Sequence, residues 1–348
     1  MSLRILGWEG TDDPSLIAPF NDKSGIAVEL DAHISDFDAA ERVLTGAGAW
    51  DLVNINSPFV RDVLSSAGLI EQLTSERLRA AAAMPMPPVF QELNRWGLSC
   101  AGAPIGVCQR FGPFNLVINT EAISVDAGED QGFALARELR FAGRYGILDY
   151  EDFNVIHIAM AAGLDPFLRM GEPQVEAFRR TAEAWYSRAA MVTSDHHALN
   201  RALVRRDIDF QLGGGVYTCS SARLAGYAQV RSVTPRSGPV EGRGGISFVE
   251  VNALMATSQK MAEAASFLEY LVQPGTALRA CLAGGSVNPV LQMLEPSVLA
   301  QFSAAHLDAM QWETLEDDLS RCAQYRVVPD YKRLRSVLRA ARSAITRA

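Results

Sequence analysis

Short apolar segments alternate with helix signals along this chain, and this alternation limits the fold more than any other feature. Near the N-terminus, apolar segments at 3–8, 26–30 and 51–55 are separated by stretches of helical spacing. The first of these stretches begins at Asp13 and Pro14, a carboxylate cap followed by proline in the first turn. An order of strand, helix, strand, helix predicts an α/β fold, in which helices cover both faces of a mostly parallel sheet.

The same pattern continues to the C-terminus and predicts two lobes. The chain has 348 residues, which is enough to build two separate cores. No Pro- or Ser-rich linker divides it, so we expect lobes that are joined by crossing strands. Further expected strands are 116–119, 145–148, 210–216 and 246–255, and further expected helices are 39–44, 61–67, 154–162, 172–189, 260–271, 274–283 and 331–345.

Composition argues against two classes of function. Lys and Arg number 32 against 40 Asp and Glu, so the net charge of −8 offers no basic excess for non-specific nucleic-acid binding. No apolar run reaches the roughly 20 residues that a membrane-spanning helix needs. No signal-peptide pattern precedes the segment 3–8, so we expect either a cytosolic protein or a chain whose signal peptide has been removed.

The cysteines indicate neither a metal site nor a disulfide framework. Their number is odd and no two of them form a C-x-x-C pair. We expect unpaired buried thiols, although Cys100 and Cys108 could form a bridge in an oxidising compartment. The five positions are Cys100, Cys108, Cys219, Cys281 and Cys322.

Two other motifs also favour structural interpretations. Asp195-His196-His197 contains residue types that bind metals, but adjacent histidines on a regular element do not readily share one ion. We therefore interpret this motif as a surface or cleft-edge loop. The triple glycine 213–215 lacks the Lys-Ser/Thr that would complete a phosphate loop, and we interpret it as a bend beside a cleft. No metal and no cofactor is expected.

Several segments occur in an order that a known family shares. They are LGWE at 6–9, SGIAV at 24–28, DLV at 51–53, the segment 105–119, ALM at 253–255, AASFLEYL at 264–271 and GSVNP at 285–289. This ordered set resembles the spermidine/putrescine-binding proteins, which are periplasmic substrate-binding components of ABC importers. The resemblance covers nearly the whole chain.

The resemblance implies a type 2 periplasmic-binding-protein fold whose two discontinuous lobes close over a solute. Lobe 1 would comprise residues 1–112 and 249–303, and lobe 2 residues 113–248 and 304–348. The protein would be a periplasmic monomer without catalytic activity. It would capture a polyamine or a related cationic amine and deliver it to membrane permease subunits, with a chemoreceptor as the alternative partner.

A polyamine site needs carboxylates that pair with ammonium groups and aromatic faces that attract them. Phe248 and Glu250 lie two residues apart on an expected strand and therefore share a face. Glu151 and Asn154 lie three apart on an expected helix. The resemblance assigns ligand binding to Trp8, Thr11, Phe59, Glu151, Asn154, Tyr217, Phe248, Glu250 and Ser286.

The chain departs from the family at several of these positions. Where an acid or a tyrosine is usual, it has Thr11, Phe59, Asn154 and Ser286. Two acids, Glu151 and Glu250, remain for the ends of a diamine or triamine. A slip in the alignment would place Asp149 or Asp152 in the role of Glu151.

Two alternative functions stay open at this stage. The same fold could bind a different solute, such as a guanidino compound, a quaternary amine or an anion. Thiaminase-like enzymes also share the fold and use a cysteine in the cleft. Cys108, near the first expected crossover, is the candidate nucleophile, but the sequence shows no base beside it.

Overall fold

The computed structural model describes residues 2–46, 50–83, 99–100 and 103–345 and divides the chain into two compact units. Unit 1 consists of Met1–Gly112 and Phe248–Leu307, and unit 2 of Pro113–Ser247 and Asp308–Ala348. The sequence analysis expected the boundaries between the lobes after residues 112, 248 and 303. Within the described ranges, no helix is both long and apolar enough to cross a membrane.

The sheet of unit 1 is built on three parallel strands. β1 (Ser2–Trp8) lies between β2 (Ala27–His33) and β3 (Leu52–Asn56), and both neighbours run parallel to it. β11 (Gly245–Leu254) pairs antiparallel with β3, so that Glu250 lies opposite Asn56. The carboxyl ends of the three parallel strands therefore meet at one edge of the sheet.

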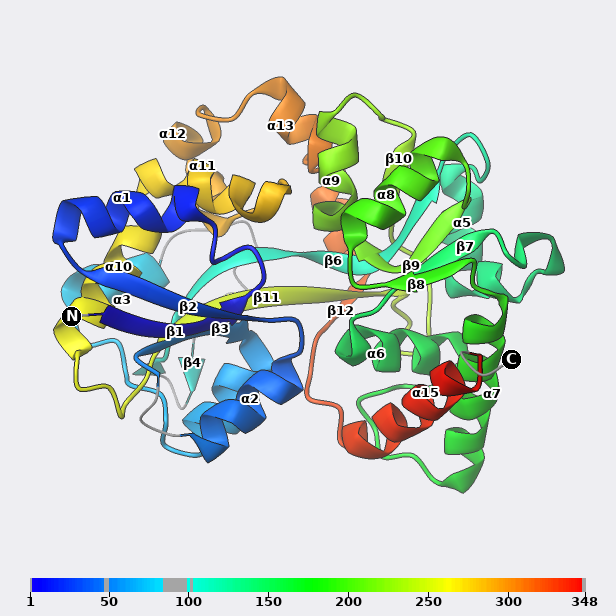
Figure 1. Cartoon of the computed structure of the whole chain (residues 1–348), viewed down its shortest axis with the longest axis horizontal. Coiled ribbons are helices and arrows are strands. Elements are labelled where there is room, and N and C mark those ends of the chain that lie inside the picture. Colours follow the sequence, from blue (N-terminus) through cyan, green and yellow to red (C-terminus); the bar gives the residue numbers. More distant parts are fainter. Residues whose placement is uncertain (1, 47–49, 84–98, 101–102, 346–348) are drawn as a thin grey trace. The chain divides into compact units, whose positions relative to one another are not determined.

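The first two helices of unit 1 begin at side-chain caps, one of which, at Asp13, was expected from the sequence. α1 (Pro14–Ser24) is capped by Asp13, which accepts a hydrogen bond from the Ser15 backbone N–H at 2.8 Å. α2 (Asp36–Thr45) is capped by Ser35. Figure 1 shows α1 and α2 on opposite sides of the blue strands. The other elements are η1 (Phe59–Ser65), α3 (Glu76–Ala82), β4 (Ser99–Cys100), β5 (Ala103–Pro104), α10 (Met261–Leu271), α11 (Pro274–Leu282), η4 (Ala283–Gly285), η5 (Leu291–Leu294) and α12 (Pro296–Leu299).

Unit 2 is also organised around a parallel core. β7 (Tyr145–Leu148) runs parallel to both β8 (Met191–Thr193) and β9 (Phe210–Gly215). β6 (Val107–Asn119) pairs antiparallel with β9 and with β10 (Val230–Val233). A short strand, β12 (Cys322–Gln324), runs parallel to the start of β11.

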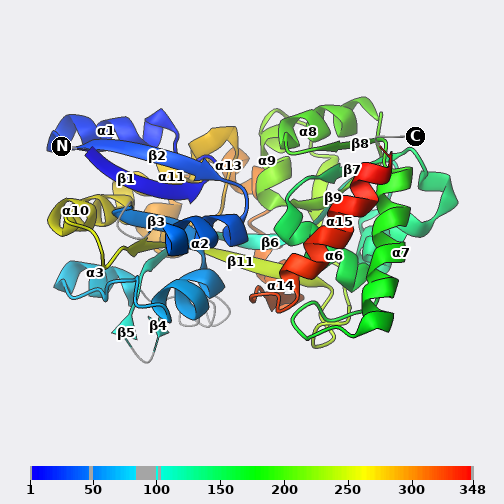
Figure 2. The ribbon, with the colours of Figure 1, turned by 60° about the horizontal axis from the view of Figure 1, so that its bottom comes forward.

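Helices cover both faces of this second sheet. In Figure 1, α8 (His196–Arg205) lies on one side of the strands and α6 (Glu151–Ala161) on the other. The C-terminal helix α15 (Tyr331–Ile345), shown in red, lies along α7 (Glu172–Arg188) in Figure 2. The other elements are α5 (Val125–Gln131), η2 (Gly132–Arg137), η3 (Leu139–Phe141), α9 (Val216–Leu224) and α14 (Leu315–Ser320), and α13 (Ala304–Ala309) leads from unit 1 into unit 2.

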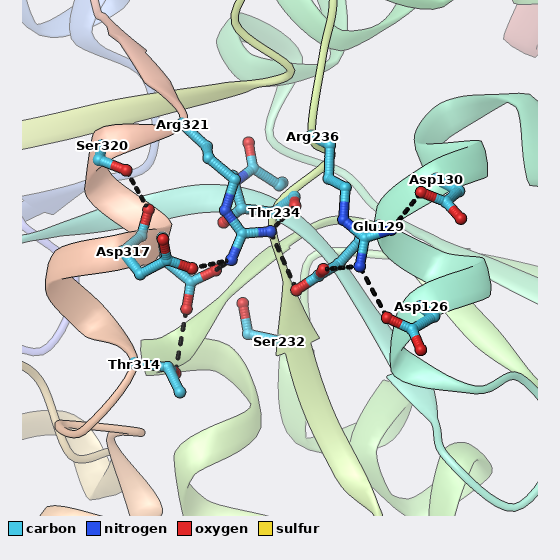
Figure 3. A network of polar contacts seen from close by, with 12 residues as sticks. Asp126, Glu129, Asp130, Ser232, Thr234, Arg236, Thr314, Asp317, Ser320 and Arg321 are labelled. Carbon is cyan, nitrogen blue, oxygen red and sulfur yellow. Dashed lines mark hydrogen bonds and ion pairs between the residues drawn. The ribbon is translucent and has the colours of Figure 1, made fainter.

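A network of ion pairs joins three segments of unit 2, as Figure 3 shows. Glu129 on α5 accepts from Arg236 and from Arg321, each at 2.9 Å. Arg236 also pairs with Asp126 at 2.7 Å. Arg321 in turn pairs with Asp317 of α14. The network thus ties the segment after β10 to α5 and α14.

Most expected elements are confirmed, and the differences have physical causes. The strands expected at 3–8, 51–55, 145–148 and 246–255 are present. β6, however, begins at Val107 and not at 116, and it continues through Gly112 and Pro113 at the expected lobe boundary. The helix expected at 61–67 is a π-helix that begins at Phe59.

Candidate functional site

The carboxyl edge of the unit 1 sheet is organised around one buried carboxylate, Asp36. Its Oδ1 accepts hydrogen bonds from Trp8 Nε1 at 2.9 Å and from the backbone N–H of Asn56 at 3.1 Å. Its Oδ2 accepts from Asn56 Nδ2 at 2.9 Å. Asp36 is 0% exposed. It therefore fixes the end of β1 against the end of β3, where open α/β sheets bind their ligands.

A ladder of buried amides continues from this edge across the sheet of unit 1. Asn54 Oδ1 accepts from the Trp8 backbone N–H at 3.3 Å, and Asn54 Nδ2 donates to Asn252 Oδ1 at 3.1 Å. Asn252 Nδ2 then donates to Gln109 Oε1, also at 3.1 Å. The ladder crosses β1, β3, β11 and β6. Since buried polar groups are costly unless they are paired, it holds the sheet in one arrangement.

Glu250 forms a buried ion pair with Arg110, a residue that the sequence analysis did not select. Arg110 Nε donates to Glu250 Oε2 at 2.8 Å, and the exposed fractions of the two residues are 5% and 7%. Arg110 Nη1 and Nη2 both point to the backbone oxygen of Glu9, at 3.4 and 3.3 Å. Burial raises the pKa of Glu250, and the Arg110 guanidinium works against that rise.

The other predicted residues of unit 1 are buried. Trp8 is 5% exposed and stands beside His33, with ring centroids 4.8 Å apart. Thr11 Oγ1 donates to the Trp8 carbonyl at 2.5 Å and closes the turn after β1. Phe59 is 1% exposed and packs edge-on against Phe37, so it is a core residue in this structure. Phe248 and Ser286 are also buried.

Arg110 connects the segments that carry several of these residues. A Cβ atom added to Gly10, whose φ is +83°, would lie 3.3 Å from Arg110 Nη1 and 3.3 Å from the Cα of Gly284. The loop after Trp8 and the loop before Ser286 therefore meet over the guanidinium, and only glycine permits this approach. The structure thus brings Glu250 and the turn at Glu9 and Gly10, which follows Trp8, against Arg110.

In unit 2, Glu151 is paired within its own unit. Arg335 Nε and Arg339 Nε donate to its two oxygens at 2.6 and 2.8 Å, and both arginines lie on α15. Burial alone would raise the pKa of Glu151, but the hydrogen bonds from Arg339 and Arg335 outweigh it and lower the pKa. This arrangement corrects the expectation that Glu151 is an acid left over for an ammonium group.

The neighbouring polar positions of α6 are engaged in a similar way. Asn154 is fully buried, and its Nδ2 donates to the Leu148 backbone oxygen at 2.9 Å. Asp149, one alternative to Glu151, pairs with Arg342 of α15 at 2.5 Å. Asp152, the other alternative, accepts a hydrogen bond from the Tyr331 hydroxyl. The contacts of Asp149 and Asp152 attach α15 to the start of α6. Both acids therefore already have a partner within unit 2.

An aromatic cluster lies at the carboxyl edge of the unit 2 sheet. Phe114 is stacked with Tyr217 at 5.9 Å and with Tyr150 at 6.2 Å between ring centroids. Tyr217 is the second residue of α9, immediately after the glycines of β9, and is half-buried. His196 stands edge-on to the Tyr217 ring at 5.7 Å. Among the residues of unit 2 that were predicted to bind a ligand, Tyr217 is thus the aromatic one, and it lies beside the end of β9.

His196 corrects the interpretation of 195–197 as a loop. Asp195 is the N-cap of α8 and accepts from the Ala198 N–H at 3.0 Å, and His196 is the first residue of the helix. His196 is 8% exposed, and burial lowers its pKa to about 4. His197 Nδ1 lies 3.3 Å from Ser221 Oγ. Among the described residues, no group of three or more His, Cys, Asp or Glu side chains is placed to hold a metal ion.

His157 leads to a prediction about acid stability. It is fully buried between the rings of Phe114 and Phe133, and its Nε2–H donates to the Phe114 carbonyl at 2.8 Å. Burial lowers its pKa to about 4. Because the unfolded chain takes up this proton near pH 6.5, the stability present at pH 7 is lost as pH falls from 6.5 towards 4. At pH 5 the loss from this group is about 2 kcal/mol.

Urea unfolding of the wild type and of His157→Gln at pH 7 and pH 5 measures this loss. Gln keeps an N–H that can donate to the Phe114 carbonyl but does not titrate. We therefore expect a smaller loss between the two pH values in the variant. An equal loss in both proteins would contradict a neutral His157.

Cys108 leads to a prediction about reactivity. Its thiol is free and 2% exposed, and burial raises its pKa well above the ordinary value. Cys100, its suggested disulfide partner, has a side chain outside the described residues. Since the thiolate is the reactive form, Cys108 should react with a thiol reagent at least a hundredfold more slowly in the folded protein than in urea. Peptide mass analysis after timed labelling checks this, and rapid labelling that a solute blocks would contradict it.

Comparison with solved structures identifies the fold of this chain. No sequence-family model and no curated protein matches the chain. Among solved structures, a putative spermidine/putrescine ABC transporter protein from Listeria monocytogenes matches with a TM-score of 0.74 and 13% identity, covering 99% of this chain and 98% of the other. The chain has a periplasmic-binding-protein fold.

Other proteins with the periplasmic-binding-protein fold match over similar lengths. The protein MotA from A. tumefaciens B6, in complex with glucopine, matches with a TM-score of 0.67 and 14% identity, covering 98% of this chain and 100% of the other. A periplasmic thiamin-binding protein matches with a TM-score of 0.64 and 15% identity, covering 98% and 96%. Proteins of this fold therefore bind solutes of quite different chemistry.

Sequence reasoning missed Asp36, Asn56, Arg110 and Phe114 at these two edges. One signal could have revealed Arg110, because it is a charged residue within an apolar run. Asp36 follows a capping serine and gave the appearance of an ordinary acid in the first turn of a helix.

Proposed function

We propose that this chain is the solute-binding component of an ABC importer. The observation that carries the proposal is the match of nearly the whole chain, 97–99% of it, to solved substrate-binding proteins. A second observation supports it: in each unit, polar or aromatic side chains gather at the carboxyl ends of the parallel strands, the usual place for ligands in such sheets.

The solute that we propose carries an amine. The names of some similar structures include spermidine and putrescine, and the ordered sequence segments resemble the same family. Tyr217 offers a half-buried aromatic face, which attracts a cation by about 0.5 to 2 kcal/mol. Trp8 stands at the end of β1, where its ring is held by Asp36. Polyamines are one group of solutes within this class.

The proposed action is capture and delivery, with no bond made or broken. The residue considered for catalysis, Cys108, is a buried thiol with a raised pKa, and this environment favours a packing role. The proposed partners are membrane permease subunits, with a chemoreceptor as the alternative. The periplasm is the proposed location, and a monomer is the proposed state.

A thermal-shift screen of the ligand-stripped protein tests this function. The panel contains putrescine, cadaverine, spermidine, spermine and agmatine, then amino acids, choline-type amines, thiamin, sugars and anions. A solute at 100 times its Kd adds about 2.7 kcal/mol of stability, which a melting curve resolves. We expect a saturable shift with an amine. A protein that responds to no solute in the panel, while retaining a cooperative transition, would contradict the proposal.

A further inference from the structure

The charges around the candidate positions do not suit a bare polycation. Glu250 is paired with Arg110, and Glu151 with Arg335 and Arg339. Asp149, the closest alternative, is paired with Arg342. A polyamine carries an ammonium group at each end, and each such group needs a carboxylate partner to offset its lost hydration. Here each of these acids already has a cation at hydrogen-bond distance.

Arg110 retains hydrogen-bonding capacity that the described residues do not use. A guanidinium has five N–H groups. One donates to Glu250 at 2.8 Å, and two share the Glu9 carbonyl at the long distances of 3.3 and 3.4 Å. Two N–H groups therefore have no acceptor among the described residues, although Arg110 is only 5% exposed. A buried donor without an acceptor is unfavourable and indicates a missing partner.

The contact with Glu250 is also incomplete. Arg110 binds Glu250 through Nε and Oε2 alone, not through the two parallel bonds of a forked pair. The terminal Nη1 and Nη2 edge points instead toward the half-buried turn at Glu9 and Gly10. That edge is the part of a guanidinium that matches a carboxylate, and a solute carboxylate bound there would replace the two long hydrogen bonds to the Glu9 carbonyl. Meanwhile Glu250 keeps lone pairs that can accept from an ammonium group.

Resting on the function proposed above, we propose that the solute is zwitterionic, an amino acid or amino-acid derivative whose carboxylate binds Arg110 and whose ammonium group binds Glu250. A buried pair of opposite charges is the complement of a molecule that carries both charges on neighbouring atoms. Such a solute adds no net charge to a buried site, whereas a diamine or a plain carboxylate adds one or more. A buried ion pair stabilises a fold weakly at best, so a binding role explains its presence at this edge better than stability does.

Matched pairs of solutes that differ by one carboxylate test this assignment. Ornithine and putrescine form one pair, lysine and cadaverine a second, and arginine and agmatine a third. Calorimetric titration of the ligand-stripped protein should give a Kd at least tenfold lower for the amino acid than for the amine in any pair that binds. Equal or tighter binding of the amine would overturn the zwitterion assignment and leave the solute-binding function intact.

A wider panel of amino acids and their N-substituted derivatives covers solutes with other side chains. If none of these binds while another solute does, the zwitterion assignment fails and the importer function stands. If no solute of any class binds, both fail.

Two conservative variants separate recognition from structural support. Arg110→Lys keeps the charge but loses the planar edge, and Glu250→Gln keeps the shape but loses the charge. If these residues contact the solute, Arg110→Lys should remove most of the preference for the amino acid over its amine. A purely structural role would weaken both members of a pair by the same factor. Asp31→Asn, at an exposed pair with Arg42 in unit 1, is the control that should leave both constants unchanged.

Discussion

Asp36→Ala should lower the free energy of unfolding by about 4 kcal/mol. Its carboxylate accepts from Trp8 Nε1 and from two N–H groups of Asn56, and all three donors are buried. Each buried donor left without an acceptor costs about 1–3 kcal/mol, part of which water entering the space can offset. Urea unfolding followed by circular dichroism measures the loss.

Two further variants show whether the loss comes from the hydrogen bonds of the Asp36 carboxylate. Asp36→Asn should recover only part of the loss, because all three partners are donors and an amide offers a single acceptor oxygen. Asp31→Ala removes an exposed aspartate whose partner is Arg42, and it should cost less than about 1 kcal/mol. If Asp36→Ala were as mild as Asp31→Ala, Asp36 would not hold the ends of β1 and β3 together.

Breaking the Arg110–Glu250 pair should produce the second large effect. Arg110→Met leaves Glu250 buried without its cation, and we expect a loss of about 3–5 kcal/mol in the free energy of unfolding. The double variant Arg110→Met with Glu250→Met replaces the pair by apolar side chains and should recover at least half of that loss. A double-mutant cycle by urea denaturation gives the coupling between the two residues.

Additive losses in the free energy of unfolding would contradict an interaction between Arg110 and Glu250. If the double variant lost the sum of the two single losses, the residues would stabilise the unit independently. The charges of Arg110 and Glu250 would then not balance each other in the fold. The electrostatic argument for a zwitterionic solute would lose its basis. Separate positions that share no contact add within a few tenths of a kcal/mol, so the experiment distinguishes the two cases.

The sequence was sufficient for the α/β class and for many individual strands, because their apolar residues lie in short runs between clear capping signals. It was less informative for β6, which was expected to begin at 116 although the strand begins at Val107. Arg110 lies in the part of β6 that was missed. The partner of Glu250 is 140 positions away along the chain, a contact that local patterns do not encode.

The site residues were harder to predict than the fold, for a related reason. Phe59 precedes the helix expected at 61–67, but the helix begins at Phe59 itself and buries the ring against Phe37. Glu151 was expected to be available, but two arginines of α15 reach it from the far end of the chain. A pattern shows which residue types are present, whereas only the folded chain shows which charges are already paired.

The histidines illustrate the same limit. The adjacent pair 196–197 suggested either a metal or a surface loop, and the structure instead buries His196 at the start of α8. His157 attracted no attention in the sequence, since a lone histidine in an apolar helix is usually a core residue. It is indeed part of the core, and its titration gives a measurable acid sensitivity.

One measurement tests the central claim, that this chain binds a solute and returns it unchanged. The ligand-stripped protein is incubated with an equimolar mixture of the amines and amino acids of the panel, separated from free solute, and denatured, and the released compounds are quantified by mass spectrometry. The account predicts close to one equivalent of a single, chemically intact solute per chain. Release of a converted product, or of no solute in stoichiometric amount, would contradict it.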